Sequence, residues 1–134
     1  MWLLDTNVVS EIRKSRPHPG AMAWFGRQEP DSLFLSVATI GEIQRGAEKT
    51  REQNPDKAME IETWLHALIA TSNVLVADDL TFVQWAKLMH RRSGDLIIDA
   101  LIAATAQVHG LTVATRNTRD FETLGVVTVN PFEG

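Results

Sequence analysis

Short apolar runs that alternate with helical stripes constrain the fold of this chain more than any other feature. Five runs rich in aliphatic or β-branched residues predict strands, at positions 2–4, 33–36, 73–77, 112–115 and 126–129. The stretches between them repeat apolar residues at helical spacing, as in Val37, Ile40, Ile43 and Ala47. Strands that alternate with helices predict an α/β fold with a mostly parallel sheet. A length of 134 residues fits one domain that spans positions 1–134.

Residues that break or end helices divide the chain further. Asn54-Pro55 interrupts the chain ahead of a helix expected over positions 59–71. Gly110 follows a long apolar helix, in the position where a left-handed residue commonly ends a helix. We find no internal repeat and no linker long enough to separate domains.

The composition narrows the classes of function. A formal charge of −4 and a pI near 5.5 argue against binding nucleic acid through bulk charge. Any such contact requires a local basic patch, and the candidates are Arg13, Lys14 and Arg16; Arg91 and Arg92; and Arg116 and Arg119. The absence of cysteine excludes disulfides, thiolate zinc sites and cysteine nucleophiles. Because no apolar run approaches the ~20 residues of a membrane span and no signal peptide is evident, we expect a soluble, cytoplasmic protein.

The first predicted strand breaks on a carboxylate, in Leu3-Leu4-Asp5-Thr6-Asn7. Ligands of open α/β sheets bind at the carboxyl ends of the strands, so Asp5 is a candidate for chemistry. The alternative is that Asp5 caps a helix that starts near Thr6. The two roles are compatible if that helix begins at the site.

Three further carboxylates lie at predicted element boundaries or beside apolar stripes: Glu42, Asp99 and Asp120. Each has a purely structural alternative. Glu42 could close a capping box with Thr39, although Ser36 competes as the start of that helix. Asp99 could complement a helix dipole, and Asp120, in the loop expected after the fourth strand, could cap a short turn. Asp99 is the hardest to explain structurally, because a charge in so apolar a helix needs a partner or a cation.

Taken together, the four carboxylates predict a cation site. Segments that follow successive parallel strands return to one edge of the sheet, where these side chains could converge. Clustered carboxylates repel unless a cation neutralises them, and an all-oxygen site favours Mg²⁺ or Mn²⁺. Metal-assisted hydrolysis of a phosphodiester is the chemistry that suits such a site. The alternative is a non-catalytic interaction module, whose acidic pocket binds a basic segment of a partner through arginine.

Other motifs carry less information. The segment from Gly41 to Gly46 resembles the start of a phosphate-binding loop but lacks the Lys and Ser/Thr that must follow. The four histidines have no metal-ligand spacing. Trp64 and Trp85 lie on apolar stripes and predict core packing, whereas Trp24 and Phe25 could line a groove for a peptide or a dimer contact.

Four ordered segments resemble the PIN-domain ribonucleases, and most closely the VapC-like and FitB-like toxins of bacterial toxin–antitoxin pairs. The matching segments are 3–7 with Ser10-Glu11 after it, 36–43 with Gly46 after it, 99–106, and 115–121. The resemblance covers the whole chain. It implies a three-layer α/β/α sandwich with a five-stranded parallel sheet, and a Mg²⁺- or Mn²⁺-dependent endoribonuclease that acts as a toxin. It also implies an RNA substrate, a cognate antitoxin and a homodimer.

The resemblance further implies roles for particular residues. Asp5, Glu42 and Asp99 match the three most constant acids of the family, with Asp5 and Asp99 as the principal metal ligands. Many members have an acid where this chain has Asn117, whereas toxins of this subgroup look similar to the Asn-x-x-acid pattern that ends at Asp120, so we assign Asp120 as the fourth acid. Asn117 then becomes a neutral ligand or a group that orients water, and either Glu42 or Asp120 would orient the attacking water. The resemblance gives the supporting or substrate-contacting positions to Thr6, Asn7 and Thr115.

Overall fold

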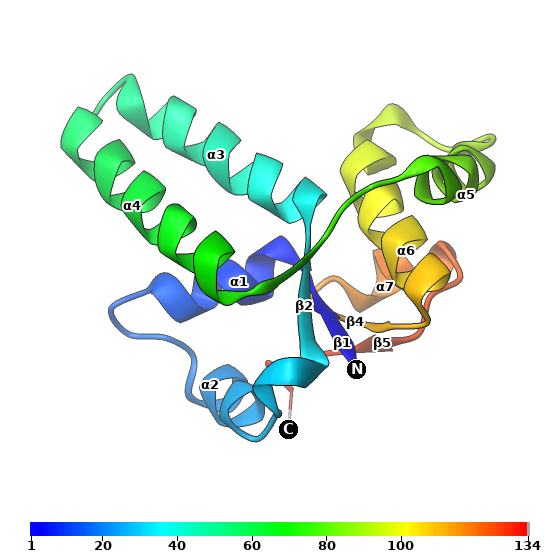
Figure 1. Ribbon diagram of the computed structural model, residues 1–134, viewed down its shortest axis with the longest axis horizontal. Coiled ribbons are helices and arrows are strands. Elements are labelled where there is room, and N and C mark those ends of the chain that lie inside the picture. Colours follow the sequence, from blue (N-terminus) through cyan, green and yellow to red (C-terminus); the bar gives the residue numbers. More distant parts are fainter. Residues whose placement is uncertain (134) are drawn as a thin grey trace.

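A five-stranded parallel sheet lies between two layers of helices in the computed structural model, which describes residues 1–133 (Figure 1). The strands are β1 (Trp2–Leu4), β2 (Leu33–Ser36), β3 (Asn73–Leu75), β4 (Thr112–Ala114) and β5 (Thr128–Val129), in the spatial order β3-β2-β1-β4-β5. All four strand pairings are parallel. The α/β/α sandwich expected from the sequence is therefore confirmed. The chain winds outward from β1 to β3 and then returns to place β4 beside β1, which makes the β1/β4 pair the switch point of the sheet.

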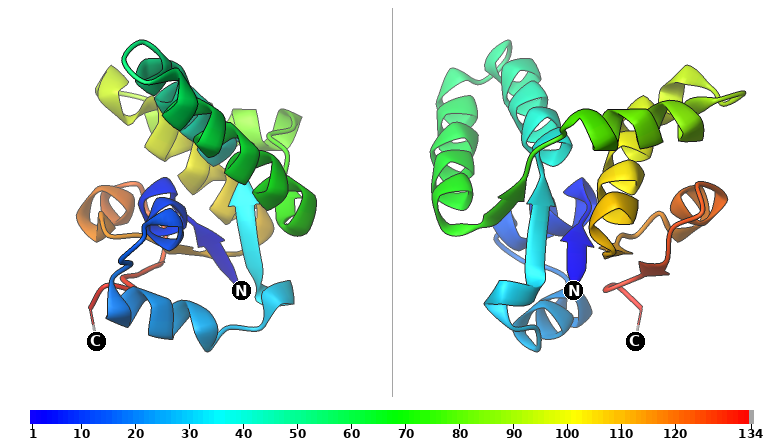
Figure 2. Two further views of the ribbon diagram at one scale, coloured as in Figure 1. Left: turned by 90° about the vertical axis from the view of Figure 1, so that its left-hand side faces the viewer. Right: turned by 45° about the vertical axis from the view of Figure 1, so that its right-hand side comes forward.

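The alternation of side chains along β1 separates the two helical layers. Leu4 packs with α1 (Thr6–Arg13), α2 (Pro19–Gly26), α3 (Val37–Arg51) and α4 (Pro55–Thr71). Leu3 faces the other way, toward α5 (Asp79–Met89), α6 (Ile97–His109) and α7 (Thr118–Thr123). Figure 2 shows the α3–α4 pair and the α5–α6 pair on opposite sides of the sheet. Short 3₁₀ turns, η1 (Pro30–Ser32) and η2 (Gly94–Leu96), precede β2 and α6.

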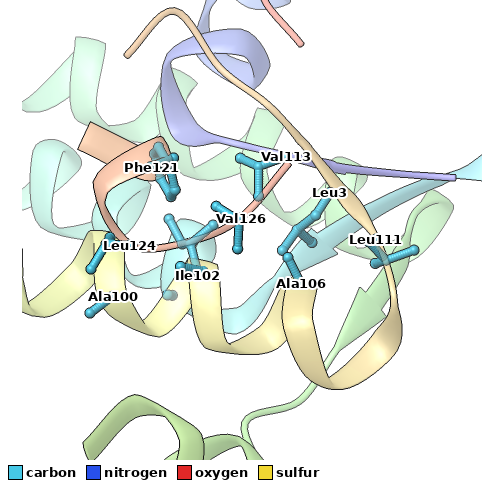
Figure 3. Packing of buried hydrophobic residues seen from close by; sticks show 11 residues of the cluster. Leu3, Ala100, Ile102, Ala106, Leu111, Val113, Phe121, Leu124 and Val126 are labelled. Atoms are coloured by element: carbon cyan, nitrogen blue, oxygen red, sulfur yellow. The ribbon is translucent and has the colours of Figure 1, made fainter. Parts of the chain in front are cut away.

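Small side chains bring α6 close to the sheet. Ile102 and Ala106 of α6 are fully buried and lie near Leu3 and Val126 in Figure 3. Alanine leaves little side chain between helix and strand, so α6 packs closely against the sheet. Gly110 ends this helix with φ 66°, as the sequence predicted.

Several element boundaries differ from the sequence-based prediction. The helix expected from position 59 begins at Pro55, because the side chain of Asn54 accepts a hydrogen bond from the Lys57 N–H and Pro55 occupies the first helical position. The strands β3, β4 and β5 are shorter than expected. At β5 the reason is visible, since the Val126 N–H bonds to the Phe121 carbonyl and closes the end of α7.

Trp64 and Trp85 are partly buried against the two cores, as expected. Trp24 is buried, and Phe25 lines an apolar pocket of about 430 Å³ between α2, β2 and the end of α4. Among residues 1–133, no helix is long and apolar enough to cross a membrane.

Candidate active site

The site begins where β1 passes into α1. The Asp5 N–H still donates to the Ala114 carbonyl of β4 at 2.9 Å, while the Asp5 carbonyl already accepts the first helical hydrogen bonds, from Val8 and Val9. One oxygen of the Asp5 carboxylate accepts from the Thr6 N–H at 2.8 Å. Asp5 is thus the N-cap of α1, and the helix begins at the edge of the sheet where ligands bind.

The second oxygen of the Asp5 carboxylate is held by side chains from two segments. Leu4 pairs with Ala114, so the next residues of the two strands, Asp5 and Thr115, are neighbours. The Thr115 hydroxyl donates to Asp5 Oδ2 at 2.8 Å, and the Asn7 amide donates to the same oxygen at 3.1 Å. The Thr115 hydroxyl in turn accepts from the Asn117 N–H at 2.9 Å. These contacts fix the direction in which the buried carboxylate faces.

Glu42 reaches the site from α3. The capping box with Thr39 is wrong, because α3 begins at Val37 and the Ser36 hydroxyl caps it by accepting from the Ala38 N–H. Glu42 instead accepts a hydrogen bond from the Thr6 hydroxyl at 2.5 Å, and the hydroxyls of Thr6 and Thr39 lie 3.3 Å apart. Thr6 therefore connects the start of α1 to Glu42.

Asp99 occupies the first turn of α6, as expected, and is partly buried. Burial, together with the negative charges of Asp5, Glu42 and Asp120, raises the pKa of Asp99 to about 6. Burial also raises the pKa of Asp5, and the charge of Glu42 adds to that rise. Asp5, Glu42 and Asp120 therefore lie near enough to Asp99 for their charges to act on it.

Asp120 and Asn117 are the exposed members of the site. Asp120 lies in the first turn of α7, a helix where the sequence predicted a loop, so Asp120 is not a turn cap. The residue at the N-cap position is Asn117, whose side chain makes no capping hydrogen bond. Both polar side chains are therefore available to solvent or a ligand.

The donor set fits a hard divalent cation. The candidate donors are all oxygens, and burial, together with the charges of neighbouring carboxylates, raises the pKa values of Asp5 and Asp99. Within residues 1–133, no three Asp, Glu or His side chains lie close enough to surround one ion. Mg²⁺ usually binds through one or two carboxylates and keeps several waters, so it does not require three protein ligands.

Sequence reasoning gave no role to a fifth acid, Glu11, which is 5% exposed. Its two carboxylate oxygens accept hydrogen bonds from Lys14 Nζ and from the His18 N–H, both at 3.0 Å, and a guanidinium nitrogen of Arg116 lies 3.9 Å away. The hydrogen bonds from Lys14 and His18 lower the pKa of Glu11. Its spacing of four residues from Asn7, on the same face of α1, was the available signal.

The model of the PIN domain family matches residues 2–126, nearly the whole chain and all of the site described above. This chain belongs to the PIN-domain family. Among its relatives, the VapC ribonuclease Y4jK of Sinorhizobium fredii is 35% identical over 99% of both chains. Toxin FitB of Neisseria gonorrhoeae is 31% identical over 98% of this chain and 99% of its own length.

The same relationship holds in three dimensions. The crystal structure of FitAcB from Neisseria gonorrhoeae superposes with a TM-score of 0.87, at 30% identity and with both chains fully covered. A toxin–antitoxin complex from Klebsiella pneumoniae superposes with a TM-score of 0.67, at 26% identity, again over both full chains. PIN-domain nucleases of the VapC type depend on a divalent metal, and the oxygen donors found here agree with that dependence.

Proposed function

We propose that this PIN domain is an Mg²⁺-dependent endoribonuclease and the toxin of a toxin–antitoxin pair. The observation that carries the proposal is the raised pKa of Asp99 beside the switch point of the sheet, to which the charges of carboxylates from three other segments contribute. A relative named as a VapC ribonuclease and a structural neighbour described as a toxin–antitoxin complex support the substrate and the partner. We expect the protein to act on RNA in the cytoplasm and to accept Mn²⁺ in place of Mg²⁺. We also expect the antitoxin to bind a homodimer of this chain.

Asp5 and Asp99 would hold the cation. A bound divalent cation would supply stabilisation of phosphate charge and a more acidic water. Thr115, Asn7 and the Thr6 N–H keep both oxygens of Asp5 in a fixed direction, which reduces the cost of binding.

Glu42 and Asp120 would orient the attacking water. Glu42 is already held by the Thr6 hydroxyl, whereas the exposed Asp120 is free to adjust to a bound strand. Asn117, whose side chain makes no capping hydrogen bond, would contribute a neutral oxygen or nitrogen to the water or the substrate.

The test compares Asp99→Asn with Asp56→Asn, a matched change of an exposed first-turn aspartate on α4, outside the site. Calorimetric titration with Mn²⁺ should detect binding to the wild-type protein and to Asp56→Asn, but much weaker binding to Asp99→Asn. Cleavage of a panel of bacterial tRNAs and single-stranded RNAs in Mg²⁺ should follow the same order.

Expression with and without the upstream neighbouring gene tests the toxin role, since growth arrest relieved by that neighbour is expected. Failure of the wild-type protein to bind Mn²⁺ at millimolar concentration would contradict the enzyme. It would favour the alternative module, in which the acidic pocket receives a basic segment of a partner.

A further inference from the structure

The basic residues noted in the sequence have different surroundings in the structure. The side chain of Arg92 is bound to the backbone of other residues, because its guanidinium donates to the carbonyls of Leu88 and Thr123 at 2.7 and 3.0 Å. Lys14 and Arg116, which are 102 positions apart, instead meet at the same carboxylate oxygen of Glu11. Two cations that lie far apart in the sequence therefore form one local patch, with a net charge of +1 once Glu11 is counted.

Arg116 lies directly beside the acidic site. The backbone N–H of Arg116 donates to the side-chain oxygen of Asn7 at 3.1 Å, and the side-chain amide of Asn7 donates to the Asp5 carboxylate. The guanidinium carbon of Arg116 lies 3.7 Å from the ring centroid of Phe132. One face of the guanidinium is thereby covered, and the patch is one helical turn along α1 from the Asp5 contacts.

The donors of this guanidinium remain available. Among residues 1–133, no hydrogen bond from the Arg116 side chain is formed, and its contact with Glu11 at 3.9 Å is too long for one. The side chain is 51% exposed, and that of Lys14 is 57% exposed. A guanidinium stacked on a ring keeps its edges free, and those edges match the oxygens of a phosphate.

We propose that Arg116 and Lys14 bind a backbone phosphate of the RNA next to the one that is cut, and that Glu11 and Phe132 position them. This inference rests on the proposed function and adds to it the residues that hold the substrate strand. A strand that approaches four carboxylates in a protein of charge −4 needs a nearby cationic contact, and this patch supplies it. Glu11, held by Lys14 and the His18 N–H, keeps the two cations together without neutralising both.

The experiment measures RNA binding by fluorescence anisotropy, with a fluorescein-labelled single-stranded 20-mer RNA and EDTA. All variants are made in the full chain carrying Asp99→Asn, so that no RNA is cut during the measurement. We compare Arg116→Gln and Lys14→Gln with Arg51→Gln. Arg51 is the control because it is also partly exposed and paired with glutamates, and lies about 14 Å along α3 from Glu42.

The expected result is a loss of affinity for Arg116→Gln of about fivefold to tenfold at low salt, with a smaller loss for Lys14→Gln. The slope of log K against log salt concentration should become shallower by about 0.7 for each lost phosphate contact. Phe132→Leu should weaken binding without changing that slope, because it removes the stacking surface and leaves the charge. Circular dichroism establishes that each variant is folded.

Three results would overturn the inference. Equal affinities and salt slopes for Arg116→Gln and Arg51→Gln would mean that Arg116 does not bind the strand, while cleavage by the wild-type protein would leave the proposed function intact. Loss of inhibition by the upstream neighbour, with RNA binding unchanged, would assign Arg116 to the protein partner. If the wild-type protein neither binds nor cuts any RNA in the panel, the proposed function fails, and the inference fails with it.

Discussion

Asp5 and Glu11 are two buried carboxylates at opposite ends of one short helix, and their surroundings shift their pKa values in opposite directions. Asp5 is 4% exposed and Glu11 is 5% exposed. Burial raises the pKa of Asp5 despite hydrogen bonds from Thr115, Thr6 and Asn7, and the charge of Glu42 adds to the rise. Glu11 has a lowered pKa, because Lys14 and the His18 N–H bond to it.

The difference separates a carboxylate paired with cations of the chain from one that faces other carboxylates. The charge of Glu11 is compensated within the chain, so it needs nothing from outside. Within the described part of the chain, Asp5 accepts hydrogen bonds from neutral donors and lies near other carboxylates, so we expect a bound cation to compensate its charge. Burial alone does not distinguish the two residues, whereas the sign of the neighbouring charge does.

The largest expected effect is on catalysis. Asp5→Asn should reduce RNA cleavage by about a thousandfold, because it removes a proposed metal ligand from the site. Glu11→Gln should reduce cleavage only about tenfold, since it loosens the cations that hold the strand. The rates of both variants on one RNA substrate give the comparison, and equal losses would remove the functional distinction between the two carboxylates.

A smaller effect is expected from the residue that supports Asp5. Thr115→Val removes the hydroxyl that bonds to Asp5 Oδ2 and keeps a similar shape. Loss of such a supporting contact typically weakens metal binding by about 10- to 100-fold. Thr81→Val is the control, because Thr81 is equally buried and bonds instead to Asp78 at the start of α5. An Mn²⁺ affinity that falls no further for Thr115→Val than for this control would show that Asp5 needs no such support.

Much of this architecture was predictable because its signals are local. The carboxylate of Asp5 follows an apolar run, Asp99 interrupts an apolar helix, and Gly110 marks a helix end; all three patterns are visible within a few positions. The start of α4 was predicted four positions too late, because the apolar stripe begins after the cap at Asn54 and the proline that follows it. The six-residue helix α7 was missed because it is too short to show an amphipathic stripe.

The contacts that organise the site were not predictable in the same way. The Thr6 hydroxyl meets Glu42 across 36 positions, and Glu11 meets Arg116 across 105. Such pairs depend on the order of the strands, which places β4 beside β1, and no local pattern records that order. The sequence therefore singled out candidate acids but could not predict that Glu11 pairs with cations whereas Asp99 lies near other carboxylates.

Removing the charge of Asp99 and removing that of Glu11 should shift the melting temperature of the metal-free protein in opposite directions. Asp99→Asn relieves repulsion among the carboxylates and should raise the melting temperature by about 3 °C. Glu11→Gln leaves Lys14 and Arg116 without their shared anion and should lower it. Scanning calorimetry in EDTA checks both. Addition of Mg²⁺ should stabilise the wild-type protein but hardly change Asp99→Asn, because only a bound ion shifts the folding equilibrium. A lower melting temperature for Asp99→Asn in EDTA would mean that its charge is already compensated within the chain.

The smallest effect, and the one that isolates the charge itself, is the dependence of stability on pH. The pKa of Asp99 is about 6 in the folded protein and near its ordinary value of 3.8 in the unfolded chain. Between these values the folded state binds more protons, so the free energy of unfolding of the metal-free protein should fall as pH rises from about 4 to 6. The pKa of Glu11 is lowered below 4.5, so its titration changes the free energy of unfolding in the opposite direction and only at lower pH. Urea denaturation from pH 5 to pH 7 should therefore show a downward slope that Asp99→Asn flattens and Glu11→Gln leaves unchanged. A slope as steep in Asp99→Asn as in the wild-type protein would contradict this prediction and assign the slope to another group, such as Asp5, whose pKa is also raised.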